Sequence, residues 1–321
     1  MPGLVVHGSG HFVAGDARTG SRLLLLEGAG LGTLAVGFVP IVLTGASRRL
    51  VGPGAALSVV GVGLFAISAI ADLYGVLVPP GGIGAPTAVV PIVQTDVGYR
   101  YVYNPVFSYR DFVVYGIDYR PGRWRVHPTA WFALNASASR VRVPLAYRLT
   151  GPVPRASSAW RDGSYFDVEA ALTRHADLAD GFVTTTAEVS LGGRLDMQRV
   201  APSLAGSFAE MGLGWGFQRY GYQVKGAASD VGELLLARFG YGLYIGWPGA
   251  AQGELMVYYD HRHDDIAAGF KLRGLGSGVA GHFGIEGRMY LSEHWGVSAE
   301  AMVGSAYVAG VSILFRHAER P

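Results

Sequence analysis

The chain has 321 residues, of which 50% are hydrophobic and 16% are charged, and this balance favours a membrane protein. Its 26 basic and 24 acidic residues leave a formal net charge of +2, so the chain lacks the basic excess that nucleic-acid binding requires. The absence of cysteine excludes disulfides, thiolate metal sites and cysteine nucleophiles. We therefore expect membrane lipid as a partner, other envelope proteins as further candidates, and neither a nucleic acid nor a cofactor.

Two long apolar runs occupy the first part of the chain. Residues 23–43 and 55–78 each approach the ~20 residues that span a bilayer as a helix. The short polar turn GASRRLVGPG separates them. These runs predict a hydrophobic helical hairpin over residues 1–81, followed by a linker rich in Gly and Pro over residues 82–94.

Small residues and carboxylates mark the two runs. Gly28 and Gly32 form a Gly-x-x-x-Gly pair, and Gly54 and Ser58 form a second small pair, so the helices are expected to approach closely there. Two carboxylates, at positions 27 and 72, fall inside the apolar runs. Charged groups at membrane depth are costly and are candidates for function, although an interfacial position would also explain Glu27 and Asp72.

From residue 95 onward the hydrophobic pattern has a period of two. In the segment RVRVPLAYRL, Val141, Val143 and Leu145 share one face, whereas Arg140 and Arg142 share the other. The same alternation recurs over residues 166–172, 209–217, 235–245, 279–291 and 311–315. Strands of this length and pattern, with Tyr and Trp near their ends, are typical of transmembrane β-barrels.

The spacing of turns predicts about twelve strands, within a range of roughly 10 to 14, between Tyr109 and Arg316. The segment Val97–Tyr103 is an additional candidate strand. Residues 95–317 thus resemble the outer-membrane β-barrel proteins of Gram-negative bacteria. The resemblance implies an all-β transmembrane antiparallel barrel over residues 95–321, located in the outer membrane.

A second, shorter resemblance concerns the start of the chain. Gly10, His11 and Phe12, followed by Gly15 and Asp16, are similar to the Gly-His-aromatic segment that begins some small two-helix membrane hairpins.

The polar face of the predicted strands carries charges of both signs, which would line a barrel lumen. In a narrow lumen such charges must form an ion-pair network, whereas in a wide one they would line a hydrated channel. The predicted lumen-facing residues are Arg140, Arg142, Arg148, Asp167, Glu169, Glu188, Glu210, Arg238, Glu286, Arg288 and Glu300.

A dense titratable cluster lies at residues 259–265. In an extended conformation His261, His263 and Asp265 share one face and present ligands suited to a metal. A charged hairpin tip explains the same residues, and we favour that interpretation because a closed metal site needs further ligands.

The pattern favours a structural role in the envelope or porin-like transport of small solutes. One alternative is an inner-membrane anchor that carries a periplasmic β-domain, in which the apolar strand faces would form a dry core. Another is a lipid hydrolase embedded in the barrel, which requires a serine beside a histidine. The candidates for such a pair are the sequence His7-Gly8-Ser9 and His282 with Ser277 and Glu286.

Overall fold

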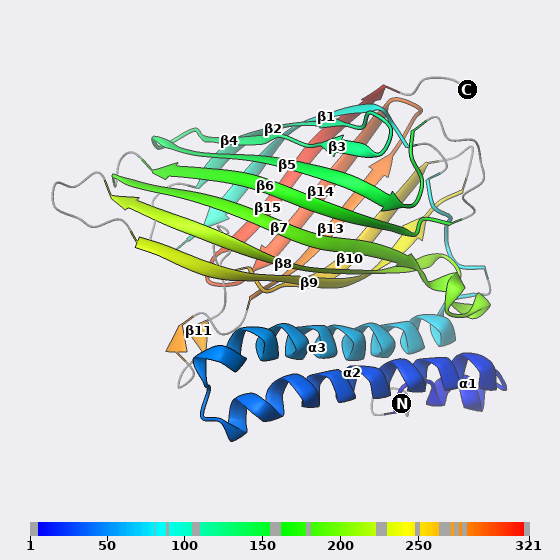
Figure 1. The fold of residues 1–321 in the computed structure, drawn as a ribbon. Coiled ribbons are helices and arrows are strands. Elements are labelled where there is room, and N and C mark those ends of the chain that lie inside the picture. Colours follow the sequence, from blue (N-terminus) through cyan, green and yellow to red (C-terminus); the bar gives the residue numbers. More distant parts are fainter. Residues whose placement is uncertain are drawn as a thin grey trace.

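The structure, a computed structural model, describes residues 6–79, 81–87, 90–104, 110–154, 162–177, 181–222, 230–247, 251–262, 271–272, 276–277 and 281–317. It consists of a helical hairpin and a β-barrel, with the helices lying along the outer wall of the barrel (Figure 1).

Three helices precede the barrel: α1 (Ser9–Val13), α2 (Ala17–Leu43) and α3 (Arg48–Leu77). Asp16 caps α2, because its carboxylate accepts hydrogen bonds from the amide and the hydroxyl of Thr19 at 3.1 and 2.6 Å. Gly15 has a φ of +83° and permits the tight turn between α1 and α2. By length and composition, α2 and α3 are each able to cross a bilayer.

Glycines bring α2 and α3 into backbone contact. A Cβ on Gly30 would lie 2.7 Å from the amide nitrogen of Phe65 and 2.9 Å from the carbonyl oxygen of Gly61. A Cβ on Gly37 would lie 2.5 Å from the carbonyl oxygen of Gly54. Larger side chains at these positions would push the two helices apart.

The predicted close approach is confirmed for one small pair and wrong for the other. Gly54 and Ser58 lie in the contact between the helices. By contrast, a Cβ on Gly28 or Gly32 would meet nothing within 4 Å. The Gly-x-x-x-Gly pair therefore lies on a face of α2 that does not contact α3, because the helix rotation places Gly30 and Gly37 at the contact instead.

The strands after the helices form one large sheet and a small ribbon. Their bounds are β1 (Val93–Tyr103), β2 (Asp111–Tyr119), β3 (Trp124–Val126), β4 (Thr129–Ala133), β5 (Ala138–Thr150), β6 (Tyr165–Asp177), β7 (Phe182–Asp196), β8 (Ser207–Tyr222), β9 (Asp230–Ile245), β10 (Gln252–Asp260), β11 (Lys271–Leu272), β12 (Gly276–Ser277), β13 (His282–Tyr290), β14 (Trp295–Val303) and β15 (Tyr307–His317). The ribbon contains β11 and β12.

The large sheet closes on itself as an antiparallel barrel. β1 pairs with both β2 and β15, which leaves no edge. Of the thirteen strands in this sheet, β3 and β4 each pair with β2 on one side and β5 on the other, so they are two halves of one strand. The described residues therefore form twelve barrel strands, and the predicted fold class is confirmed: an antiparallel β-barrel of about twelve strands that follows a helical hairpin.

The predicted count is right, but one strand was assigned differently. The candidate segment Val97–Tyr103 belongs to β1, which begins at Val93 and is one of the twelve strands. Tyr109, where the predicted series of strands begins, lies outside the described residues. The division of the chain into a hairpin, a linker at 82–94 and a barrel remains a prediction; α3 ends at Leu77 and β1 begins at Val93.

Apolar side chains cover the outside of the barrel, and charged side chains face inward together with two buried apolar clusters, one around Phe112 and one around Phe208. In β15 exposed and buried residues alternate without exception, and the exposed set includes Val311 and Ile313, at 60% and 57% exposure. This arrangement contradicts the expectation of the anchored-domain alternative, which placed the apolar faces in a dry core. A barrel with an apolar exterior and a polar interior suits a bilayer.

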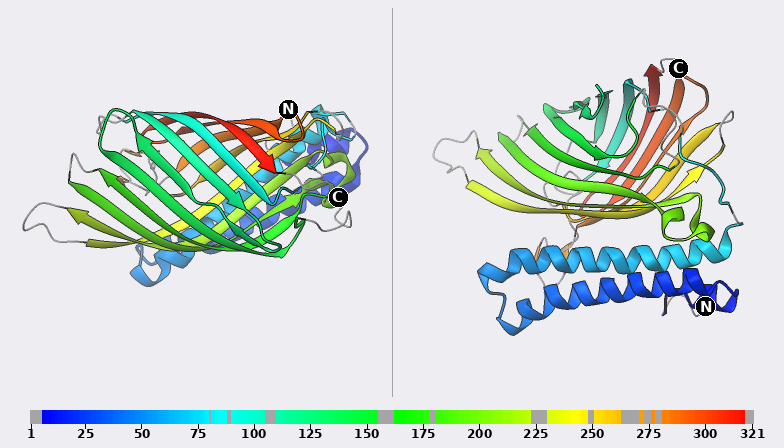
Figure 2. Two further views of the ribbon diagram at one scale, coloured as in Figure 1. Left: turned by 90° about the horizontal axis from the view of Figure 1, so that it is seen from above. Right: turned by 45° about the vertical axis from the view of Figure 1, so that its right-hand side comes forward.

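The hairpin packs on the barrel wall formed by β8 and β9. Figure 2 shows that α3 lies next to this wall and that α2 lies on the side of α3 away from the barrel. Gly63 of α3 lies against the ring of Phe239, whose side chain points out of the barrel. The buried apolar cluster between the two parts comprises Leu23, Ile67, Ala71, Tyr74, Met197, Ala201, Leu204, Ala209, Phe239 and Tyr241.

Polar contacts join the hairpin to the connection between β7 and β8, which contains the short helices η2 (Met197–Arg199) and η3 (Pro202–Leu204). The hydroxyl of Tyr74 donates to the carbonyl oxygen of Ala205 at 2.7 Å, and the hydroxyls of Thr19 and Ser203 lie 2.8 Å apart. We call the end of the barrel that contains this connection and the start of β1 the proximal rim.

Candidate functional site

The barrel interior contains two adjoining cavities. The first has a volume of about 430 Å³ and is bounded mainly by β5 to β9. The second, of about 470 Å³, is bounded mainly by β1, β2, β10, β13, β14 and β15 and reaches the proximal rim. Both fall within the size range of small-molecule sites. They share the wall residues Arg125, His127, Tyr165, Glu210 and Arg238.

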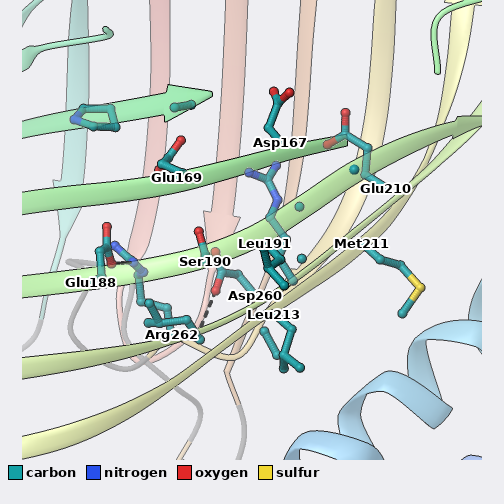
Figure 3. Close-up of a pocket in the computed structure, with 18 of the residues that line it drawn as sticks. Asp167, Glu169, Glu188, Ser190, Leu191, Glu210, Met211, Leu213, Asp260 and Arg262 are labelled. Atoms are coloured by element: carbon teal, nitrogen blue, oxygen red, sulfur yellow. Dashed lines mark hydrogen bonds and ion pairs between the residues drawn. The ribbon is translucent and has the colours of Figure 1, made fainter. Parts of the chain in front are cut away.

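In the first cavity, ion pairs connect strands that are distant in the sequence. Glu188 of β7 accepts hydrogen bonds from Arg142 of β5 and from Arg262, which follows β10. Arg142 also donates to Glu169 at 2.9 Å. Figure 3 shows Glu169 and Glu188 on neighbouring strands of this cavity, while Met211 points away from it toward the helices. The Glu188 side chain is only 3% exposed, so its charge depends on these guanidinium partners.

The second cavity is crossed by a further pair. Arg194 of β7 donates to both oxygens of Glu254 of β10, at 2.7 and 3.0 Å, and to Glu210 of β8 at 2.7 Å. Arg288 of β13 also lies 2.7 Å from Glu254. Because only β8 and β9 separate β7 from β10, these bonds bridge one side of the lumen and narrow it there.

Asp118, at the end of β2, holds two arginines in the same cavity. Arg120 and Arg125 each bind both of its oxygens, at distances between 2.6 and 3.1 Å. Such fork-like pairing fixes both guanidinium planes.

The structure places all eleven residues that the sequence predicts for the lumen on the walls of these cavities: Arg140, Arg142, Arg148, Asp167, Glu169, Glu188, Glu210, Arg238, Glu286, Arg288 and Glu300. Their role as a functional site remains a prediction. Ion pairs also connect Arg148 with Asp167 at 2.9 Å and Arg238 with Glu286 at 2.9 Å.

Sequence reasoning missed several members of this network. On β7, Arg194 lies an even number of residues from Glu188, and on β10, Glu254 lies an even number of residues from Met256. An even spacing within a strand places both residues on the same face, so the alternation pattern was sufficient to predict that Arg194 and Glu254 face inward. Asp118 lies at the end of β2, where a charged residue before a turn looks like an ordinary loop residue.

A segment from the hairpin crosses the proximal mouth of the barrel. We call residues 81–92 the strap; the structure describes residues 81–87 and 90–92 of it. It pairs with the rim next to β9, where the amide of Ala85 donates to the carbonyl oxygen of Gly246 at 3.0 Å, and it ends at β1. The strap residues that line the second cavity are Pro86, Thr87, Val90 and Pro91.

The path of the strap follows from the topology. The hairpin docks on β8 and β9, while β1 lies on another side of the barrel, with β10, β13, β14 and β15 between β9 and β1. The chain has to pass from one side to the other, and it does so across the mouth rather than around it (Figure 1). The strap therefore covers part of the opening.

The cluster at 259–265 is only partly described. The hydroxyl of Tyr259 and Nδ1 of His261 lie 2.8 Å apart. His263 and Asp265 lie outside the described residues, so the metal hypothesis stays untested there. Within the part of the chain that the structure describes, no group of three or more His, Cys, Asp or Glu residues could hold a metal ion.

Glu27 and Asp72 lie in a buried polar corner between α1, α2 and α3. Glu27 accepts a hydrogen bond from the backbone amide of His7 at 3.0 Å, and His7 Nδ1 lies 2.6 Å from the hydroxyl of Ser68. Asp72 is 1% exposed, and its Oδ1 lies 3.9 Å from Nε2 of His11. Both carboxylates are therefore buried among the helices, and their assignment as intramembrane or interfacial groups stays a prediction.

The serine and histidine candidates for a hydrolase do not form a pair in the described residues. His282 packs edge-on against the ring of Tyr258, and Glu286 binds Arg238. The side chain of Ser277 lies outside the part of the chain that the structure describes. A serine that does contact a histidine is Ser68, which sequence spacing gave no reason to choose; Ser68 and His7 are both fully buried.

No known protein family matches the chain, and no curated protein matches it. Three solved structures that resemble it are barrels. The KdgM porin in complex with disordered oligogalacturonate is 9% identical, with a TM-score of 0.39 over 70% of this chain and 99% of that chain. The NanC porin is 10% identical, with a TM-score of 0.37 over 70% of this chain and 100% of that chain. The outer membrane protein Omp33 of Acinetobacter baumannii is 10% identical, with a TM-score of 0.35 over 72% of this chain and 100% of that chain.

These likenesses concern the fold. The oligogalacturonate belongs to the KdgM structure, and at such low identity nothing about ligands follows for this chain. Its assignment as a barrel rests on its own strand pairing, in which β1 closes the sheet against β15.

Proposed function

We propose that this protein is an outer-membrane barrel that conducts small polar solutes. The observation that carries the proposal is the combination of a closed sheet, an apolar exterior and two adjoining polar cavities that follow the interior. An apolar exterior is suited to lipid, and charged, partly hydrated walls are suited to polar solutes. The ion pairs that cross the lumen favour small solutes over large ones.

The strap is proposed to restrict passage through the proximal mouth. Pro86, Thr87, Val90 and Pro91 lie over the second cavity, and the strap is held at both ends, by the hairpin and by β1. A segment fixed in this way narrows the entrance without blocking the first cavity.

The location is tested by separating the inner and outer membranes of the native cells and running each fraction, boiled and unboiled, on a gel. We expect the protein in the outer membrane, with a mobility that changes on boiling. Conductance of the purified protein in a planar bilayer then tests transport. Inner-membrane recovery, or a folded barrel without any ion conductance, would contradict the proposal.

A disulfide tests the strap separately. A Cβ on Gly163 would lie 3.5 Å from the Cβ of Pro86, which is within the range that a disulfide bridges. The variant Pro86→Cys with Gly163→Cys also carries Tyr244→Phe, because the Tyr244 hydroxyl occupies the space needed at residue 163. Since the chain has no native cysteine, the reduced form of the same variant is the control. Because the strap already lies across the mouth, we expect equal conductance in the oxidised and reduced forms; a higher conductance in the reduced form would show that the strap leaves the mouth when it is not tethered, and would contradict a fixed restriction.

A further inference from the structure

The second cavity contains a local surplus of guanidinium groups. Arg120 and Arg125 share the single carboxylate of Asp118. On another wall, Arg194 and Arg288 share Glu254, and Arg194 also binds Glu210. In this group, four arginines therefore meet three carboxylates, which leaves one positive charge in excess.

The surplus is local, because seven arginines meet seven carboxylates over the whole cavity once Asp96 and the Arg148 partner Asp167 are included. Three arginines have carboxylate partners of their own, in the pairs Arg148 with Asp167, Arg238 with Glu286 and Arg100 with Glu300. The remaining carboxylate of the cavity wall, Asp96, lies 3.9 Å from the imidazole of His127 instead of contacting an arginine. The surplus is thus a property of the group around Asp118 and Glu254.

The positive charges in this group act on one another. Arg120 lies in the turn after β2, where burial and the neighbouring charge of Arg125 lower its pKa, and Arg288 adds to this effect. Arg288 also repels Arg125. Like charges held together in a partly enclosed space are stabilised when an anion binds between them.

Arg125 and Arg288 are more accessible than the carboxylates that they bind. The side chains of Arg125 and Arg288 are 33% and 38% exposed, whereas those of Asp118 and Glu254 are 2% and 17% exposed. A solute that enters the cavity therefore meets N–H donors first, and these donors match the geometry of carboxylate and phosphate oxygens.

We propose that the second cavity binds a small oxyanion, carrying a carboxylate or phosphate group, between Arg125 and Arg288. The inference deepens the proposed transport function, on which it rests, by naming the class of solute. In the first cavity the two arginines that bind Glu188 are less accessible: the side chains of Arg142 and Arg262 are 24% and 11% exposed. Its lining comprises five arginines and five carboxylates, namely Arg125, Arg140, Arg142, Arg238 and Arg262 with Asp167, Glu169, Glu188, Glu210 and Asp260.

The test is titration calorimetry of the purified full-length barrel in detergent with citrate and, separately, with inorganic phosphate. We expect Arg125→Gln and Arg288→Gln each to weaken binding about tenfold or more, the loss expected when a hydrogen bond to a charged group is removed. Arg125→Gln leaves Arg120 paired with Asp118, so the barrel should still fold. The matched control is Arg140→Gln in the first cavity, which should bind as the wild type does.

Each variant is first checked for folding by its boiling-dependent gel shift. Equal affinity in the wild type, Arg125→Gln and Arg288→Gln would overturn the anion site, as would an absence of binding to both probes by the folded wild type. Binding of citrate alone would identify carboxylates as the solute class, and binding of phosphate alone would identify phosphates. Anion binding by a barrel without conductance would contradict the transport function but support the anion site. Conductance without anion binding would support the transport function but contradict the anion site.

Discussion

The barrel lumen and the helical corner both hold charged groups away from bulk water, but these groups have different partners in the two regions. In the lumen, Glu188 and Glu254 are bound by arginines from strands far away in the sequence. In the corner, His7 Nε2, His11 Nε2 and Asp72 Oδ1 are buried without a hydrogen-bond partner among the described residues. Buried atoms without a hydrogen-bond partner also occur in the lumen, for example Arg238 Nε. The two regions differ in the partners of their carboxylates, which are arginines in the lumen and histidines in the corner.

The physical reason lies in the two kinds of backbone. Inward side chains of a closed sheet converge on one space, so a guanidinium reaches a carboxylate on another strand. Helices bring few side chains together unless glycines let their backbones touch, and the ring of His11 sits where a side chain on Gly75 would otherwise be. The polar groups of the corner are thus placed by packing, and their bonds are incomplete.

Removal of one buried charge from the lumen should cause the largest loss in the free energy of unfolding. Glu188→Gln would leave Arg142 and Arg262 without their shared carboxylate, and we expect a loss of about 3 kcal/mol in the free energy of unfolding. Urea unfolding of the reconstituted protein, followed by tryptophan fluorescence, measures this. Glu286→Gln is the control, because its side chain is 41% exposed and should cost less than about 1 kcal/mol. Equal losses of unfolding free energy in the two variants would show that burial of an ion pair does not determine how much it stabilises the barrel.

The glycine contact between the helices should come next. Gly30→Ala places a Cβ 2.7 Å from the Phe65 nitrogen, and overpacking of this kind costs about 1–3 kcal/mol. Gly28→Ala, two residues away on the same helix, meets no atom within 4 Å and should stabilise the protein by up to about 1 kcal/mol through helix propensity. The same unfolding assay gives both values. If both substitutions changed the free energy of unfolding in the same direction, α2 and α3 would not pack as described.

Asp72 tests the contrast directly. Because its Oδ1 has no hydrogen-bond partner in the described part of the chain, Asp72→Asn should change the free energy of unfolding by less than about 1 kcal/mol, although the residue is as buried as Glu188. The comparison with Glu188→Gln in one assay is the measurement. A loss as large as that of Glu188→Gln would show that the corner also depends on a charge pair.

The smallest effect is expected at the proximal rim. Burial opposes ionisation of Asp162, but hydrogen bonds from Arg199 and from the Ser164 amide outweigh it and lower the pKa of the carboxyl. A lowered pKa stabilises the folded state above the unfolded value of 3.8, and this stability is lost as the pH falls through the folded value. Asp162→Asn should therefore cost less than about 1 kcal/mol at pH 7 and nothing in strong acid. Unfolding curves at both pH values measure the difference; a cost that persists in acid would assign it to packing.

The sequence predicted much of the lumen because alternation alone decides which side chains face inward. Arg140, Arg142 and Glu188 share a face for that reason, whatever strands lie beside them. Their partners were not predictable in the same way. Glu188 meets Arg262 across 74 residues, and Arg194 meets Glu254 across 60, because barrel closure and strand register set those distances.

The helices show the same division. The apolar runs predicted a hairpin, and Gly54 and Ser58 lie at its contact as expected. The rotation of α2, which uses Gly30 and leaves Gly28 outside, depends on the partner surface of α3 and cannot be read from one run alone.

By itself, the sequence determined the two periods, and with them a helical hairpin followed by a barrel with apolar and polar faces. The tertiary structure decided the wall on which the hairpin docks, the route of the strap across the mouth, and the pairing that places two arginines on the single carboxylate of Asp118. A local pattern determines the direction of each side chain, whereas these features depend on contacts between segments that meet only when the sheet has closed.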